Sequence, residues 1–155
     1  VDDAENESIG FRINKWELKG VPLRIEVGPK ELEKKVVTVV RRDTGEKMQL
    51  PIKTLEKEVT KLLDDIQYNL LQEAENFLHE HTHSTDSYAP FKEIMKESRG
   101  FISALWCEDP ACEQKIKEDT KATTRCMPLD TAEERGSCVS CGKSATHRWY
   151  FAQSY

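Results

Sequence analysis

All five cysteines of this chain lie between residues 107 and 141, and four of them form two closely spaced pairs. The pairs are Cys107-x4-Cys112 and Cys138-x2-Cys141, with twenty-five residues between them. A tetrahedral metal site requires this pattern, because each short-range pair binds one side of the ion and the longer segment brings the pairs together. Four thiolates leave no position for water, so such a site supports the fold and performs no chemistry. The spacing favours a structural zinc site over reduced, unliganded thiols.

Other roles for the cysteines are less favoured. An odd number of cysteines without a visible secretory signal disfavours a disulfide framework and favours reduced thiols, so we expect a cytoplasmic protein. A redox role for Cys138 and Cys141 is less favoured, because the sequence around them does not show the strand–CxxC–helix pattern of thioredoxin-like proteins. Gly142 suits a metal knuckle, because glycine lets backbone amides turn toward a thiolate. Cys126 lies in an apolar stretch and is expected to be a buried core thiol, but its nearness to the pairs leaves a ligand role open.

A second candidate metal motif is "HEHTH", residues 79–83. It matches the H-E-x-x-H zinc-protease pattern, with His79 and His83 as ligands and Glu80 as base. That pattern requires the interior of a stable helix and a third ligand downstream. Here it falls at the end of a long helical stretch, just before the turn-forming "STDS". We expect an exposed final helical turn whose histidines favour the helix dipole, and a metalloprotease is kept only as an alternative.

The rest of the sequence alternates helical and strand patterns, which predicts an α/β protein. Residues 54–80 have the strongest helical period, with Thr54 as the expected N-cap. Shorter helices are expected over 10–20, 30–35, 88–97 and 109–120, and strands over 21–27, 36–40, 48–52, 101–106, 123–129 and 147–155. "THSTDS", residues 82–87, is predicted to be a linker. It divides the chain into expected domains over 1–80 and 81–155.

The charge is uneven along the chain. The net charge of −5 argues against a general nucleic-acid binder. Residues 12–47, however, hold ten Lys and Arg against six Asp and Glu. Basic and acidic side chains around short strands can form an ordinary solvated sheet edge. They can also read the exposed edges of unpaired bases, since Arg and Lys donate to phosphates and guanine while Glu accepts from base amino groups. Spacing alone leaves both interpretations open.

Residues 16–47, "WELKGVPLRIEVGPKELEKKVVTVVRRDTGEK", closely resemble the anticodon-binding domain of prolyl-tRNA synthetases. The later segments "LLDDIQYNLLQEAENFLHEH", "CEDPACEQKIKEDTKATTRCMPL", "CVSCGK" and "YFAQSY" resemble the C-terminal zinc domain of the eukaryote/archaeal-type enzyme. The resemblance implies an α/β fold, a class II anticodon-binding domain with a mixed sheet and a long helix, followed by a small α+β zinc-binding domain. Residues 1–3 align with the second strand of the anticodon domain, so its first strand and helix are expected to be missing and its sheet to be incomplete.

The resemblance also implies site residues. The family reads two guanines of the proline anticodon, and the matching positions here are Glu17, Arg24, Lys30 and Glu31. Glu31 stands where the family usually has Asp. Arg41 and Arg42 are our own additional candidates for RNA backbone or loop contacts. The zinc ligands of the family fall on Cys107, Cys112, Cys138 and Cys141. The family ends in a Tyr whose carboxylate reaches toward the catalytic domain, and Tyr155 matches it.

The resemblance implies that the parent protein is a proline–tRNA ligase, and the expected substrates and partners are those of that enzyme. We expect tRNA(Pro), the catalytic domain of the same enzyme and a homodimer as partners, and no membrane. ATP and Mg²⁺ belong to the catalytic domain, whose class II motifs are absent from this sequence, so this chain alone is expected to be non-catalytic. The alternative is a freestanding accessory module that resembles an anticodon-binding domain and binds RNA.

Overall fold

The chain folds into two compact units, Val1–Ala74 and Glu75–Tyr155. The computed structural model describes residues 1–4 and 6–154, so Tyr155, the expected terminal contact, lies outside the described residues. The division between the units falls within the long helix α3 (Leu55–Glu80). The expected domain boundary between residues 80 and 81 stays a prediction.

The first unit is built on an antiparallel sheet in the order β1-β2-β3. Its described strands are β1 (Leu23–Glu26), β2 (Val36–Arg41) and β3 (Lys47–Pro51). The prediction of a central strand at 36–40 is confirmed, because β2 pairs with both neighbours. The β-branched run "VVTVV" suits this position, since side chains there pack on both faces of the sheet.

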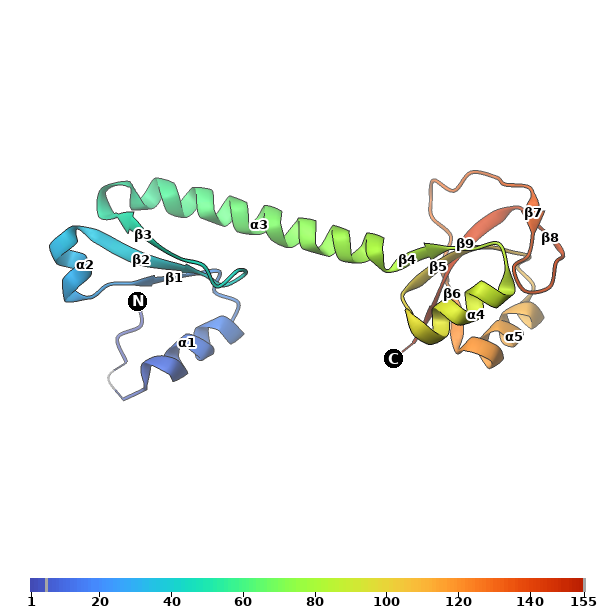
Figure 1. Cartoon of the computed structure of the whole chain (residues 1–155), viewed down its shortest axis with the longest axis horizontal. Helices are drawn as coiled ribbons and strands as arrows, with labels where there is room; N and C mark the ends of the chain where they lie inside the picture. The colour runs from blue at the N-terminus through green and yellow to red at the C-terminus, as the bar shows by residue number, and fades with distance from the viewer. Residues whose placement is uncertain (5, 155) are drawn as a thin grey trace. The chain divides into compact units, whose positions relative to one another are not determined.

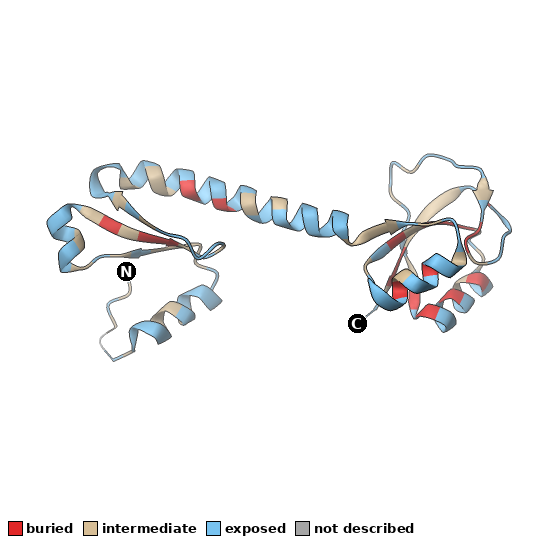
Figure 2. Cartoon of the chain, in the orientation of Figure 1, coloured by how far each residue is buried: buried red, intermediate tan, exposed pale blue. Residues whose placement is uncertain are grey.

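Two helices lie on opposite sides of this sheet, α1 (Ile9–Leu18) and α3, as Figure 1 shows. On the α3 side, Val37 and Val39 of β2 pack against Leu62 to form a small core. Figure 2 shows these buried stretches on β2 and on the facing turns of α3. A third helix, α2 (Pro29–Lys34), joins β1 to β2. The sheet therefore presents one covered face to α3 and a more open face to α1.

Two expectations for the first unit were wrong. Thr54 does not cap α3, because it ends a short 3-10 helix (Ile52–Thr54) that runs directly into α3, and its hydroxyl donates to the Pro51 carbonyl at 3.4 Å. Residues 1–3, aligned with a strand, lie in no strand. The Asp2 carboxylate instead accepts from the Ala4 amide and from the Arg12 and Trp16 side chains, which holds this segment against α1.

The second unit is built on a mixed sheet in the order β4-β5-β9-β6. Its strands are β4 (Thr82–Ser84), β5 (Phe101–Trp106), β6 (Ala122–Cys126) and β9 (His147–Gln153). The linker predicted at 82–87 was wrong in its first half, because β4 pairs in parallel with β5 from Thr82 to Ser84. Strand β4 also ends the helical pattern: His79 lies on α3 and His83 on β4, so the two histidines share no helical turn.

The main core of the second unit lies between the sheet and two helices, α4 (Tyr88–Glu97) and α5 (Pro110–Thr120). Phe91 and Met95 of α4 and Ile116 of α5 are almost completely buried against Ile102 and Phe151. Helix α5 begins as predicted, with Pro110 at its first position and the Asp109 carboxylate accepting from the Ala111 amide at 3.0 Å. A two-stranded ladder, β7 (Gly136–Ser137) with β8 (Ser144–Ala145), frames the second cysteine pair.

Candidate functional sites

The two cysteine pairs meet in one cluster at the edge of the second core. The Sγ atoms of Cys107, Cys112, Cys138 and Cys141 all lie within 4.8 Å of one another. The closest approaches are 3.5 Å, between Cys107 and Cys141 and between Cys112 and Cys138. Each close contact therefore joins one pair to the other. The sequence prediction that the intervening segment brings the pairs together is confirmed.

The fold places each pair at the end of a regular element. Cys107 directly follows β5, and Cys112 lies in the first turn of α5. Cys138 and Cys141 lie in the turn between β7 and β8, where the Gly142 amide donates to the Cys138 carbonyl at 3.0 Å. Gly142 has a φ of 73°, a conformation that suits glycine. The amide of Val139 donates to the Leu105 carbonyl at 2.9 Å, which fastens the turn to β5.

Burial and hydrogen bonds change the pKa values of three thiols in the cluster, lowering one and raising two. Burial raises the pKa of Cys138, but hydrogen bonds from the backbone amides of Cys141, Ser140 and Cys107 outweigh burial and lower the pKa to about 7. Burial raises the pKa of Cys107 and of Cys112. Because a cysteine binds a metal as its thiolate, binding of a cation at the cluster would release the thiol protons that remain.

The geometry of the cluster fits a tetrahedral metal ion. A metal–sulfur distance of about 2.3 Å places tetrahedral sulfur atoms about 3.8 Å apart. The closest sulfur pairs here are 3.5 Å apart and none exceeds 4.8 Å. Among the described residues this is the one group of three or more His, Cys, Asp or Glu side chains that could hold a metal ion. The cluster can therefore hold a metal through four thiolates.

Surrounding side chains brace the cluster. The Lys143 ammonium donates to Asp109 Oδ2 at 2.8 Å, which links the second cysteine pair to the N-terminus of α5. Two buried polar atoms nearby, Trp106 Nε1 and Ser140 Oγ, make no hydrogen bond within the described part of the chain. Trp106 directly precedes the first ligand position, and Ser140 lies between the second pair.

Cys126 does not belong to the cluster, and the expectation that it is a buried core thiol was wrong. Its side chain is exposed. It ends β6, an edge strand, just after an irregularity in pairing between Thr124 and Cys126. Such a bulge inserts an extra residue and reverses which side chains face the core.

A second candidate site lies on the α1 side of the first sheet. Arg24 of β1 forms ion pairs with Glu17 of α1 through Nη1 at 3.0 Å and with Glu26 through Nε at 2.8 Å. The Arg24 side chain is 26% exposed, and the two carboxylates are more exposed. Sequence reasoning missed Glu26, although residues two apart on a strand share a face. The three side chains form a polar cluster with both donors and acceptors that solvent can reach.

This polar cluster borders a groove of about 920 Å³ lined by residues of α1, β1 and β2. Apolar side chains dominate its lining, among them Ile13 and Trp16 of α1 and Val40 of β2. Arg41 and Arg42 lie on the same groove. An apolar groove bordered by a few polar groups is the usual form of a site that accepts a flat, partly polar ligand.

The other residues expected at this site have different surroundings. Lys30 and Glu31 lie in the first turn of α2, and Lys30 is exposed. A Cβ at Gly28 would lie 2.7 Å from a Glu31 carboxylate oxygen, so Glu31 folds back over the start of its own helix. Arg42 is exposed. Arg41 instead pairs with Asp43 through two hydrogen bonds of 3.0 and 2.6 Å.

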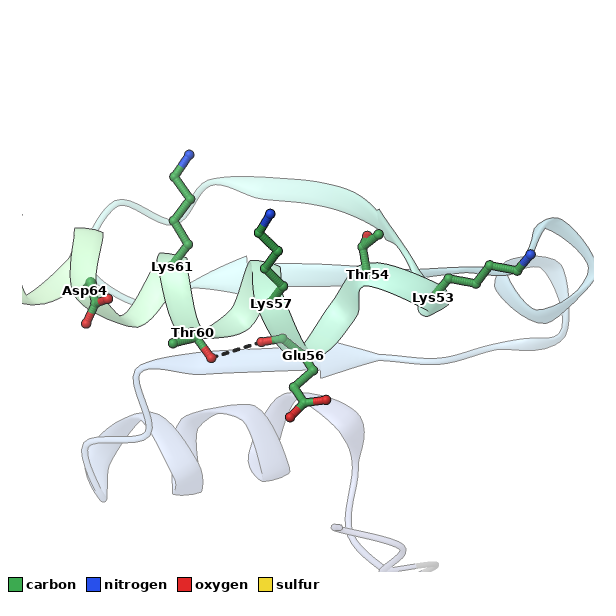
Figure 3. Close-up of a pocket in the computed structure, with 7 residues that line it drawn as sticks. All are labelled: Lys53, Thr54, Glu56, Lys57, Thr60, Lys61 and Asp64. Atoms are coloured by element: carbon green, nitrogen blue, oxygen red, sulfur yellow. Dashed lines mark hydrogen bonds between the residues drawn. The ribbon is translucent and has the colours of Figure 1, made fainter.

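A basic pocket of about 550 Å³ lies at the start of α3. Figure 3 shows its lining, in which Lys57 and Lys61 extend from the side of α3 that faces away from α1. Within the described residues no carboxylate pairs with these lysines. Because α3 covers the opposite face of the sheet from Arg24, this pocket is separate from the polar cluster.

Comparisons with known proteins identify both parts of the chain. Residues 1–62 match the family model "Anticodon binding domain", and residues 88–155 match "Prolyl-tRNA synthetase, C-terminal". The proline–tRNA ligase of Natranaerobius thermophilus is 45% identical over all of this chain, and that of Clostridium novyi is 42% identical over 99% of it. Each match covers 32% of the relative, so the chain spans about a third of the length of these proteins.

A solved structure agrees with the sequence comparisons. The crystal structure of prolyl-tRNA synthetase from Cryptosporidium parvum, complexed with L-proline and AMP, is 36% identical and superposes with a TM-score of 0.88. The match covers 100% of this chain and 33% of that one.

Among the described residues, no helix is both long and apolar enough to cross a membrane.

Proposed function

Because the chain belongs to the prolyl-tRNA synthetase family and corresponds to its C-terminal part, we propose that it selects tRNA(Pro) for a proline–tRNA ligase by reading the anticodon. The observation that carries the proposal is the Arg24 guanidinium, held between Glu17 and Glu26 at the border of an apolar groove. The whole enzyme would use ATP and Mg²⁺ in its catalytic domain to attach proline to the tRNA.

Guanine carries the complementary groups. Its O6 and N7 atoms accept hydrogen bonds, and its N1–H and N2–H₂ groups donate them. The Arg24 guanidinium has five donors, of which the two carboxylates engage Nε and Nη1. An unpaired guanine can thus receive hydrogen bonds from Arg24 while Glu17 accepts from its amino edge. The apolar lining of the groove would cover the face of the base. Lys30, Glu31 and Arg42 would contact the neighbouring nucleotides.

The test measures binding of the full chain to an anticodon stem-loop of tRNA(Pro) and to the same RNA with one anticodon guanine replaced by adenine. Arg24→Ala should weaken binding of the first RNA by about 1–3 kcal/mol and reduce the discrimination between the two. Lys57→Ala is the matched control, because Lys57 lies on the opposite side of the sheet. Unchanged affinities of Arg24→Ala for both RNAs would show that Arg24 does not read a base.

For the cysteine cluster we propose a structural zinc ion bound by Cys107, Cys112, Cys138 and Cys141. The closed set of four thiolates supports this role, since it leaves no open coordination position. The ion would join the end of β5, the start of α5 and the β7–β8 turn. Zinc removal should therefore loosen the second unit.

A metal assay tests the zinc site. The purified chain should contain one equivalent of zinc, and Cys107→Ser should lose it together with thermal stability. Cys126→Ser, which changes an exposed thiol outside the cluster, should retain both. Retention by Cys107→Ser with loss in His79→Ala would favour the metalloprotease alternative instead.

The remaining assignments follow from family membership. We propose that the chain acts beside the catalytic domain of the same enzyme, in a homodimer in the cytoplasm. The alternative is a freestanding RNA-binding accessory module. The genomic sequence upstream of Val1 separates them, because only the ligase requires class II catalytic motifs there.

A further inference from the structure

The two carboxylates that pair with Arg24 come from elements that are held with different firmness. Glu26 ends β1, where it pairs with Thr38 of the central strand β2. Glu17 lies on α1, a helix none of whose residues is buried. An element with few buried contacts moves more readily than a paired strand. Glu26 is therefore the carboxylate with the fixed position.

The contact with Glu26 sets the direction of the Arg24 guanidinium. Arg24 Nε donates to Glu26 Oε1 at 2.8 Å, and the two residues share one face of β1. Nη1 donates to Glu17 Oε1 at 3.0 Å, and Nη2 has no partner in the described part of the chain. Because the guanidinium is planar, a hydrogen bond at Nε also fixes where Nη2 lies. Nη2 thus remains available to a ligand in the groove, which all three side chains line.

The charge of this cluster distinguishes a base from a phosphate. A lone guanidinium binds any phosphate through two parallel hydrogen bonds. Here one guanidinium stands beside two carboxylates, so the cluster carries a formal charge of −1 and repels a phosphate. The edge of a guanine is neutral and has both acceptors and donors. The cluster therefore favours a base over the RNA backbone.

The second carboxylate matters most when the ligand is bound. A guanine that donates to Glu17 shares that carboxylate with Arg24, which weakens the hydrogen bond between the two side chains. Glu26 keeps its contact at Nε, on the far side of the guanidinium from Nη1. We propose that Glu26 is a positioning residue that determines specificity: it orients Arg24 and balances its charge, so that Arg24 donates to a guanine and not to a phosphate. The proposal rests on the base-reading role of Arg24 proposed above.

The test separates the charge of Glu26 from its shape. Glu26→Gln keeps the side-chain length and an oxygen that can accept from Nε, but it loses the charge. The full chain is titrated with the tRNA(Pro) stem-loop and its guanine-to-adenine variant at several salt concentrations. Glu26→Gln should bind the adenine variant about 2- to 5-fold more tightly, the range of an exposed ion pair, and the preference for the unchanged stem-loop should fall. The slope of log affinity against log salt should become steeper by about 0.7, because Arg24 gains a phosphate contact.

Two further variants provide the controls. Glu26→Asp keeps the charge and should keep the salt slope of the unchanged chain. Glu93→Gln removes the same charge from an exposed position on α4 in the second unit, and it should leave both affinities and the slope unchanged. A purely structural role of Glu26 would not steepen the slope, since a damaged site loses contacts to RNA.

The results separate this proposal from the base-reading role of Arg24. Unchanged affinities and slope in Glu26→Gln would overturn the role of Glu26, while Arg24 would still read the base. Weaker binding of the tRNA(Pro) stem-loop, without tighter binding of the adenine variant, would also overturn it, because Glu26 would then contact the base itself. Equal effects of Glu26→Gln and Glu93→Gln would assign the change to net charge. Failure of Arg24→Ala to alter either affinity would overturn both proposals.

Discussion

Arg41 and Arg42 are adjacent in the sequence, but the fold gives them different surroundings. The Arg41 side chain is 13% exposed and forms an ion pair with the Asp43 carboxylate, which is 2% exposed. The Asp43 carboxylate also accepts a hydrogen bond from the Asn69 side chain of α3 at 3.2 Å. Arg42 is exposed beside the groove. The sequence motif "RRDTGEK" cannot separate them, because strand alternation says which side each residue faces and not which partner it meets. We therefore propose that Arg41 mainly stabilises the fold and that Arg42 is the one of the two available to contact RNA.

The buried Arg41–Asp43 pair predicts an acid-sensitive first unit. The hydrogen bond from Arg41 lowers the pKa of Asp43 against the effect of burial. A carboxylate with a depressed folded-state pKa stabilises the fold above its unfolded pKa, about 3.9, and this contribution is lost as pH falls through the folded-state value. Asp43→Asn should lower the free energy of unfolding at pH 7 by about 1–3 kcal/mol, with the difference vanishing at strongly acidic pH.

Denaturant unfolding of the two proteins between pH 7 and pH 2 measures this difference. Asp64→Asn serves as control, because Asp64 is exposed on α3, and it should follow the unchanged chain throughout. A penalty for Asp43→Asn that stays constant to pH 2 would show that Asp43 acts through shape and not through its charge.

Among the elements, those with local signals could be predicted and those that depend on distant partners could not. Asp109 and Pro110 mark the start of α5 within two residues, and the structure agrees. Strand β4 has no such signal. It forms because β5 offers an edge, and Gly100, at φ 84°, lets the chain pass directly against the His81 carbonyl before β5 begins. A three-residue strand of Thr, His and Ser gains its structure from that pairing.

The cysteines also divide into a feature that the sequence predicts and one that depends on tertiary structure. The spacing predicted that four thiols meet, because the requirement is in the ligand chemistry itself. It did not predict that Cys126 faces solvent, because a bulge in the β6–β9 pairing is a tertiary feature. The sequence also did not reveal that Glu26 belongs to the polar cluster. Its place there depends on Arg24, which lies beside it on the same face of β1, and on Glu17, which reaches Arg24 from α1.

At the scale of the whole molecule, a chain of net charge −5 is proposed to bind a polyanion. This is possible because the basic residues concentrate between residues 12 and 47, and solution ions screen charges more than about 10 Å away. Binding should then depend on a few local contacts. The identity of the bases would be read by Arg24, and phosphate attraction would come from exposed groups such as Arg42.

Arg42→Gln tests this distribution of roles. It should weaken binding of the tRNA(Pro) stem-loop and of its guanine-to-adenine variant by the same factor, because a phosphate contact carries no base information. The slope of log affinity against log salt should become shallower by about 0.7, the value for one contact to a single strand. Lys117→Gln removes the same charge from α5 in the second unit and should leave the slope unchanged. Equal effects of the two substitutions would mean that net charge governs binding, and a changed preference between the two RNAs would mean that Arg42 reads a base.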